Sequence, residues 1–133
     1  MKENNRQYLI TLGELVERLS ILQLREMLIK NGREKNAADI RKIMADINTI
    51  ISSNKVVVDA KFLRLVLLTG ELNTLIWLYK DRLEDDYNYY LKLSHQLNGL
   101  RNQIKNIINT EAKEEGASVT NVSTDGLDFY ISL

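Results

Sequence analysis

The stretch of sequence that decides the fold is residues 60–82, AKFLRLVLLTGELNTLIWLYKDR. As a helix it is apolar nearly all round, because its aliphatic and aromatic residues fall on every side. Asp59 is suited to cap its start by accepting a hydrogen bond from a free N–H of the first turn. A helix with no polar face is surrounded, so we expect this one at the centre of the domain or at a subunit interface. Gly70, in its middle, predicts the close approach of another backbone or a kink.

The first helix of the chain is predicted to start at Thr11, because Thr11 and Glu14 have the spacing of a capping box. It runs to about Lys30, and Gly32 follows as its C-terminal cap. Its apolar residues form two adjacent stripes rather than one, which indicates contact with two neighbouring elements. This pattern is typical of a helix in a bundle.

Two more helices complete the predicted set. One begins after Asn36 and ends near residues 52–54, and the β-branched residues 56–58 form an extended link to the central stretch. The other spans about 86–115 and ends at Gly116. Its apolar residues recur at alternating three- and four-residue steps, the spacing of a coiled-coil seam. The seam consists of Tyr90, Leu93, Leu97, Leu100, Ile104 and Ile107.

The rest of the chain is assigned from the spacing of its apolar and polar residues. Residues 117–133 alternate apolar and polar residues around the turn Asp125-Gly126, which predicts a C-terminal β-hairpin. Residues 1–10 form a polar N-terminal arm, and 11–115 hold the helices. The sequence thus predicts one domain, 1–133, of the all-α class: a four-helix bundle-like domain with an appended hairpin. Because so small a bundle has few elements to cover an all-round apolar helix, we also expect a homo-oligomer.

The composition excludes several classes of site and partner. The chain has no cysteine and one histidine, His95, which rules out disulfides, thiolate nucleophiles and the usual zinc sites. Its 18 basic and 18 acidic residues cancel, which predicts no nucleic-acid partner. The N-terminus lacks the apolar core of a secretory signal, and Lys61, Arg64 and Glu71 interrupt the most apolar stretch. We therefore expect a cytoplasmic protein with no membrane partner.

Three segments carry a resemblance to a known family. They are ITLGELVERLSIL at residues 10–22, Asn73 followed by Ile76-Trp77, and Asn98, Arg101, Ile104-Lys105 and Ile108-Asn109. Together they resemble an uncharacterised family of bacterial and phage helical proteins with an S-I-G-E-L-I-D-K-L-x-I-L opening and an N-D-x-R-x-x-I-K-x-x-I-N closing segment. Gly99 replaces the aspartate of the closing motif, and Lys80 and Glu84 replace an acidic and a basic family position. The resemblance implies a helical fold and is compatible with a phage origin, but it implies no activity.

A polar strip beside the seam is the main candidate site. Asn98, Arg101, Lys105 and Asn109 fall at three- and four-residue steps and so share one helix face. Arginine and lysine there can bind a phosphate or carboxylate, while the asparagine amides can bond a sugar or base. Trp77 can stack on a planar ligand, although such aromatics are more often core or interface anchors. In the alternative interpretation the strip pairs with Glu14 and Glu17 of the first helix and fixes the register of the bundle.

Two pairs of acidic residues at three-residue spacing, which we call acidic steps, suggest metal binding instead of anion binding. Glu14 and Glu17 form an E-x-x-E pair, and Asp81 and Glu84 form a second step after the apolar stretch. Facing each other, such steps can hold Mg²⁺ through carboxylate oxygens and leave positions for phosphates. All-α nucleotide pyrophosphohydrolases resemble this, with E-x-x-E followed by E-x-x-D. Glu14 is also explained as a capping-box residue, which weakens this interpretation.

These features give one leading functional prediction and two alternatives. The leading one is a non-enzymatic binding protein, without a cofactor, that captures an anionic small ligand such as a nucleotide signal. Its predicted ligand-binding residues are Arg18, Trp77, Asn98, Arg101 and Lys105. The first alternative is a protein-interaction module, or an inhibitor of a partner protein, that uses the helical surface and the hairpin. The second is the Mg²⁺-dependent hydrolase, so the sequence favours a non-enzyme without excluding an enzyme.

Overall fold

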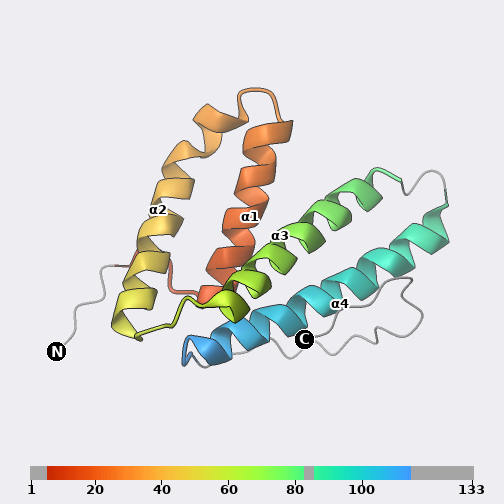
Figure 1. Ribbon diagram of the computed structural model, residues 1–133. Helices are drawn as coiled ribbons and strands as arrows, with labels where there is room; N and C mark the ends of the chain where they lie inside the picture. The colour runs from red at the N-terminus through yellow and green to blue at the C-terminus, as the bar shows by residue number, and fades with distance from the viewer. Residues whose placement is uncertain (1–5, 83–85, 115–133) are drawn as a thin grey trace.

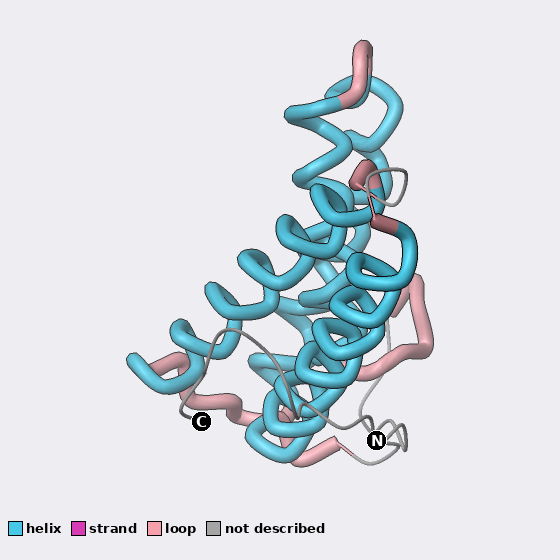
Figure 2. The backbone as a smooth tube through the Cα atoms, turned by 90° about the vertical axis from the view of Figure 1, so that its right-hand side faces the viewer, coloured by secondary structure: helices cyan, strands magenta, loops and turns pink. Residues whose placement is uncertain are grey.

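The computed structural model describes residues 6–82 and 86–114, which form four helices and no strand (Figure 1; Figure 2). The helices are α1 (Leu12–Leu28), α2 (Gly32–Ser53), α3 (Ala60–Lys80) and α4 (Tyr87–Glu111). The predicted all-α class is therefore confirmed over this part of the chain. The β-hairpin predicted at 117–133 lies outside the described residues.

The helices form two antiparallel hairpins, α1–α2 and α3–α4, which meet at one end and diverge toward the other (Figure 1). Helix α1 contacts each of the other three helices, whereas α2 packs on α1 and reaches neither α3 nor α4. The hairpins meet where α1 and α3 begin and where α4 ends (Figure 1). The bundle is therefore open on one side, between the later turns of α1 and α3.

Helix α1, and not the all-round apolar α3, is the central helix of the described residues. The two apolar stripes of α1 explain this, since one faces α2 and the other faces the α3–α4 hairpin. On α3, only 33% of the most apolar window is buried, and Leu67 is 65% exposed. The expectation that α3 is surrounded within its own domain is therefore wrong. The other expectation, a subunit interface, stays a prediction.

Among the described residues, α3 is the one helix long and apolar enough to cross a membrane by length and composition alone. Core helices of soluble proteins pass the same test, so this finding by itself assigns α3 to no environment. Lys61, Arg64 and Glu71 lie within its length, and charges of this kind are costly in a bilayer.

Three helix starts follow the expected capping chemistry. Thr11 Oγ1 accepts a hydrogen bond from Glu14 N at 3.3 Å, and Asp59 Oδ1 accepts one from Phe62 N at 3.0 Å. The side chain of Asp86 caps α4 in the same way. The predicted starts at these three positions are therefore confirmed to within one residue.

The junction between α1 and α2 differs from the prediction. Helix α1 ends at Leu28, and the left-handed residue of the turn is Asn31, with φ of 62°, rather than Gly32. Gly32 instead begins α2, about a turn earlier than expected from Asn36. A Cβ on Gly32 would lie only 2.0 Å from the carbonyl oxygen of Arg25, so the glycine permits close packing of the two helix ends.

Lysines terminate α2 and α4. Lys55 and Lys113 adopt left-handed backbone conformations, with φ of 53° and 58°. The following residues close Schellman motifs, since Val56 N donates to Ile51 O at 3.0 Å and Glu114 N donates to Asn109 O at 2.9 Å. Helix α4 therefore ends at Glu111, before the predicted end near 115.

One continuous core fills the region where α1, α3 and α4 meet and extends between α1 and α2. The predicted α4 seam is buried at Leu93, Leu97, Leu100 and Ile104. Its next fully buried residue is Ile108 rather than the predicted Ile107, because a straight helix drifts from a strict 3.5-residue repeat. The main core residues are Leu12, Leu15, Val16, Leu22, Ile43, Ile50, Phe62, Leu65, Leu72, Ile76, Leu93, Leu97, Leu100, Ile104 and Ile108.

Candidate functional site

Helices α1 and α4 make their closest approach at Gly13. A Cβ at this position would lie 2.6 Å from Lys105 Cγ and 2.7 Å from Asn109 Oδ1, so only glycine fits. Gly13 N donates to Asn109 Oδ1 at 2.8 Å, and Leu12 N donates to Glu114 Oε1 at 2.5 Å. With Thr11 bonding Glu14 N, side chains satisfy three of the free N–H groups at the start of α1. Asn109 of the predicted polar strip therefore caps another helix.

A chain of ion pairs continues from this contact along α1. Lys105 Nζ lies 3.3 Å from Glu14 Oε1 and 3.5 Å from Glu17 Oε2, and Arg101 Nη2 lies 3.6 Å from Glu17 Oε1. The side chains of Lys105, Glu17 and Arg101 are 11%, 14% and 19% exposed. These charges are thus mostly removed from water, where their attraction is stronger than at the surface.

Arg101 also connects this chain of ion pairs to α3. Its Nη1 donates to Asn73 Oδ1 at 2.6 Å, and Asn73 Nδ2 donates to the backbone carbonyl of Glu17 at 3.4 Å. Three helices are therefore joined through buried or half-buried polar groups. We call this cluster the polar junction; its members are Gly13, Glu14, Glu17, Asn73, Arg101, Lys105 and Asn109.

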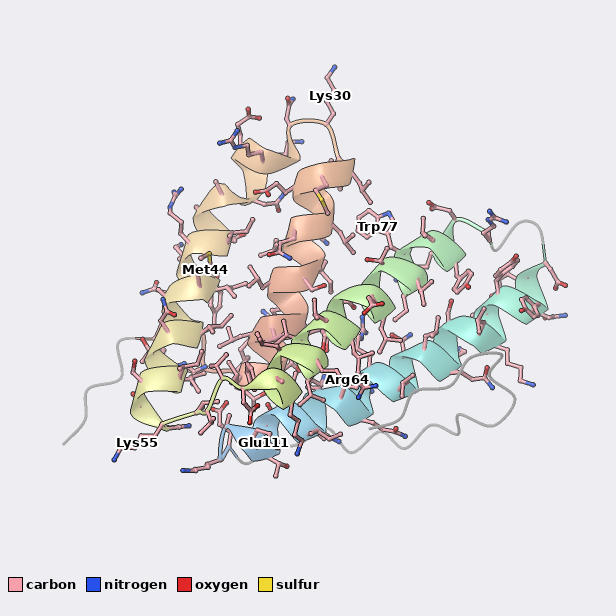
Figure 3. All side chains as sticks on the ribbon, viewed as in Figure 1. Lys30, Met44, Lys55, Arg64, Trp77 and Glu111 are labelled. Carbon is pink, nitrogen blue, oxygen red and sulfur yellow. The ribbon has the colours of Figure 1, made fainter. Side chains whose placement is uncertain are left out.

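The predicted ligand-binding residues are only partly brought together. Arg101 and Lys105 belong to the polar junction, and Arg18 reaches its edge, with Nε 3.8 Å from Glu14 Oε2. Asn98 is half-buried on α4, and Trp77 is half-buried on α3 (Figure 3). No hydrogen bond or ion pair between the residues that the structure describes joins Asn98 or Trp77 to the junction.

The polar junction has the geometry of the register-fixing alternative. Arg101 and Lys105 of α4 both face carboxylates of α1, so an incoming anion would have to compete with Glu14 and Glu17. Removing either carboxylate partner from a largely buried cation is costly. Binding of an anion by Arg101 and Lys105 stays a prediction.

The residues of the Mg²⁺ alternative do not form a cluster in the described part of the chain. No group of three or more acidic or histidine side chains gathers there in a way that could hold a metal ion. Glu14 and Glu17 face cations, and Asp81 follows the end of α3, about 12 Å along the helix from Asn73. Glu84 lies outside the described residues.

An apolar groove of about 680 Å³ lies between α1 and α3. Among the described residues, Glu71 is the single charged residue of its lining. Sequence reasoning did not find this groove, although the apolar character of α3 on every side was a signal for it. Its lining consists of Val16, Leu19, Ser20, Gln23, Leu24, Met27, Ile47, Phe62, Val66, Leu67, Gly70, Glu71, Thr74 and Leu75.

A smaller cavity of about 450 Å³ lies between the N-terminal arm, α1 and α2. The arm is fixed there because the backbone N–H groups of Gln7 and Tyr8 donate to the buried carboxylate of Asp46, at 2.8 and 2.7 Å. Tyr8 Oη donates to Asp39 at 3.4 Å, and desolvation, followed by the charge of Asp39, raises the pKa of Tyr8. The remaining lining residues include Arg18 and Arg25.

The polar junction, the apolar groove and the smaller cavity are the candidate sites of the described residues. Comparisons with protein families, with curated proteins and with solved structures give no match to this chain.

Proposed function

We propose that this chain is a non-enzymatic protein-interaction module that docks an amphipathic helix in the groove between α1 and α3. The observation that carries the proposal is the apolar groove itself, which runs beside exposed leucines of α3. An exposed apolar surface of this kind is costly for a soluble protein unless a partner covers it. Helix-in-groove recognition uses such a surface.

The dimensions of the groove suit a helix. An α-helix about 10 Å wide occupies on the order of 120 Å³ per residue, so a groove of about 680 Å³ accommodates about six residues. Two small residues face each other across the groove, since a Cβ on Gly70 would be 3.8 Å from Ser20 Oγ. Gln23 and Glu71 add polar groups to an otherwise apolar lining. Apolar anchors at i, i+3 and i+4 of a helix would fit this arrangement.

The electrostatics favour a protein over an anionic ligand at the groove. None of the described residues that line it is a lysine or arginine, and Glu71 would repel a phosphate or carboxylate. The energy of binding there must come from apolar burial, at about 25 cal/mol per Å² removed from water. An amphipathic helix supplies such a surface.

Site-specific photo-crosslinking tests this proposal. A photoreactive phenylalanine analogue replaces Leu67 in the groove, and in a control chain it replaces Lys92, which is exposed on α4. After illumination in cells of the native host, we expect a protein adduct at 67 and none at 92. The adduct should disappear when Thr74→Glu, which introduces a charge into the groove, is combined with the probe.

The identity of the adduct is then established by mass spectrometry and reproduced with the purified partner. Equal adducts at 67 and 92, or an adduct at 67 that survives Thr74→Glu in a folded chain, would contradict the proposal. So would the absence of any adduct at 67.

A second candidate function, binding of an anionic small ligand, is favoured by one observation in the smaller cavity. Arg25 lines it, and its guanidinium has no hydrogen bond or ion pair with the residues described. Arg18 lies two turns earlier on α1 and lines the same cavity, as does the ring of Tyr8. Two guanidinium groups and an aromatic ring suit a planar anion such as a nucleotide. Asp39 offsets part of that positive charge.

A thermal-shift panel of mono-, di- and cyclic nucleotides, with and without Mg²⁺, tests this second function, because a ligand that binds the folded state raises the melting temperature. A rise in melting temperature without Mg²⁺ that is lost in Arg25→Ala would support the anion-binding function. Arg33→Ala is the control, because Arg33 is exposed on α2, and it should keep the rise. If Arg101→Gln removes the stabilisation and Arg25→Ala does not, the polar junction is the site instead. A panel without any shift argues against both anion sites.

A further inference from the structure

We propose that the helix docked in the groove belongs to a second copy of this chain, whose α3 runs antiparallel to the first copy's α3 and crosses it near Gly70. The inference rests on the proposed function, because it identifies the occupant of the same groove. Each α3 would then lie in the groove of the other copy, in a two-fold symmetric pair. Three features of α3 support this arrangement.

The first feature is a row of residues along the groove side of α3, which we call the α3 stripe: Leu63, Leu67, Gly70, Thr74 and Trp77. They follow one another at steps of four and three residues, the repeat by which one helix packs along another. Leu63 and Leu67 are 52% and 65% exposed, so no element of the described chain covers this end of the stripe. The repeat indicates a helix as the missing partner.

The second feature is the lack of a side chain at position 70. At Gly13 an added Cβ would collide with α4, so packing within the chain requires that glycine. At Gly70 the nearest atom to an added Cβ is Ser20 Oγ at 3.8 Å, which is ordinary van der Waals contact. Glycine lowers the stability of a helix interior, and packing within the described chain does not require it here. The close approach of a partner helix gives position 70 a reason to lack a side chain.

The third feature is the distribution of bulk along the α3 stripe. With two antiparallel copies crossing at Gly70, Leu63 of each copy opposes Trp77 of the other, and Leu67 opposes Thr74. Large side chains then lie at both ends of the contact and the smallest at its centre, which allows close packing of the axes. A parallel pair would place Trp77 on Trp77 and Thr74 on Thr74, and it would also align the two helix dipoles unfavourably. The antiparallel contact is self-complementary, as two-fold symmetry requires.

The charge and the size of the surface support a second copy as the occupant. The chain carries 18 basic and 18 acidic residues, so two copies do not repel each other over long range. Fourteen residues line the groove, and Leu63 and Trp77 extend it, which is somewhat below the 20 to 30 residues a side of a standard interface. We therefore expect a dissociation constant on the order of micromolar.

Sedimentation velocity of the full chain, from about 1 µM to about 300 µM, tests the association. We expect the wild type to shift from monomer to dimer across this range. Leu67→Glu should weaken the dimer at least about tenfold, since it places a charge in the apolar contact. Met44→Glu is the matched control, because Met44 is also a large exposed apolar residue, 50% exposed against 65% for Leu67, but lies on α2 (Figure 3). It should leave the association unchanged, and circular dichroism checks that both variants fold.

Disulfide formation tests the orientation, and the absence of cysteine from the natural chain makes single cysteines informative. Gly70→Cys should link two copies on mild oxidation, because residues at the crossing point lie within the range that a disulfide spans. Leu63→Cys alone should not link, because Leu63 opposes Trp77 of the other copy, and that copy's own Leu63 lies 14 residues, about 21 Å of helix, from its Trp77. A mixture of the Leu63→Cys and Trp77→Cys chains should form the mixed dimer.

A wild-type monomer at every concentration would overturn this inference, as would self-linking of Leu63→Cys without the mixed dimer. In the photo-crosslinking experiment, an adduct of position 67 with a different protein would overturn the self-association but leave the proposed docking function intact. The absence of any adduct would contradict both the self-association and the docking function. Flotation of the wild type with phosphatidylcholine vesicles, abolished by Leu67→Glu, would overturn it in favour of a bilayer.

Discussion

Gly13 and Gly70 both lie within helices, but only Gly13 is packed too tightly to accept a side chain. Gly13 lies where α1 meets α4, and its missing side chain lets Asn109 reach the backbone N–H at the start of α1. Gly70 lies over an open groove, where an added methyl group would meet only Ser20 at contact distance. The same residue type thus serves the fold in one place and leaves a surface open in the other.

Substitution of these glycines by alanine should change stability in opposite directions. Gly13→Ala places a Cβ 2.7 Å from the carbonyl oxygen of Lys105 and the same distance from Asn109 Oδ1, so α1 and α4 must move apart. We expect a loss of about 2 kcal/mol or more in the free energy of unfolding, as for other overpacked sites. Gly70→Ala should increase it by up to about 1 kcal/mol, because alanine is the better helix former.

Urea denaturation at a protein concentration below that of dimer formation measures both changes, since association would otherwise add to the apparent stability. Equal losses for the two substitutions would show that position 70 is packed as tightly as position 13.

At the scale of single elements, the apolar periodicity of α4 decides what it buries. Leu97 and Ile104 are fully buried and Leu100 is 6% exposed, all on the side that faces α1 and α3. The α3 helix carries more apolar residues than α4, yet it buries only Phe62, Leu65, Leu72 and Ile76, because α1 and α4 cover only one of its sides. The apolar periodicity of α4 therefore predicted which of its faces is buried. The apolar composition of α3 predicted only that another element covers α3, without identifying that element.

Leu100→Ala should destabilise the chain by about 2 to 5 kcal/mol, the usual cost of removing a leucine side chain from a packed core. Leu63→Ala is the control, because Leu63 is 52% exposed and its truncation should cost less than about 1 kcal/mol in the monomer. Chemical denaturation of both variants measures the difference. A loss for Leu100→Ala no larger than that for Leu63→Ala would mean that the seam is not the buried face.

The sequence predicted three of the four helix starts to within one residue and the end of α2 correctly, but it missed the start of α2 and the end of α4 by about a turn. Thr11, Asp59 and Asp86 are residues that cap helices by well-known side-chain hydrogen bonds, and each lies at the cap that the structure shows. The left-handed residues that end helices are Lys55 and Lys113, and lysine carries no sequence signal for that conformation. Their backbone geometry depends on the turn as a whole, and a sequence pattern does not specify it.

The candidate site was predicted in part for a related reason. Helical spacing placed Arg101, Lys105 and Asn109 on one face of α4, and they do share it. What that face meets depends on how α1 crosses α4, and Gly13 fixes that crossing. The groove between α1 and α3 likewise depends on the divergence of the two hairpins, which no local pattern encodes (Figure 1).

At the scale of the whole molecule, the junction of the two hairpins combines apolar packing with the polar junction. The α1–α2 hairpin packs on the α3–α4 hairpin through α1, and Asn54 Nδ2 at the end of α2 also donates to the carbonyl of Ala112 at the end of α4, so the contacts of α1 are the main determinant of the angle between the hairpins. Arg101 of α4 links the two hairpins, since it donates a hydrogen bond to Asn73 of α3 and forms an ion pair with Glu17 of α1. The width of the groove, and with it any docking function, depends on this angle.

Arg101→Ala should therefore destabilise the whole chain, by about 3 kcal/mol, because it leaves the largely buried carboxylate of Glu17 with Lys105 as its remaining charged partner. Replacing both groups, as in Glu17→Leu with Arg101→Met, should cost much less than the sum of the single changes, since a packed apolar pair leaves no buried charge. A double-mutant cycle by urea denaturation measures the coupling, which we expect between about 0.5 and 3 kcal/mol. Arg64→Ala, an exposed arginine on α3, serves as the control. If Arg101→Ala left the stability unaltered, Arg101 would be available to a ligand, and the anion-binding function would regain its first candidate residue.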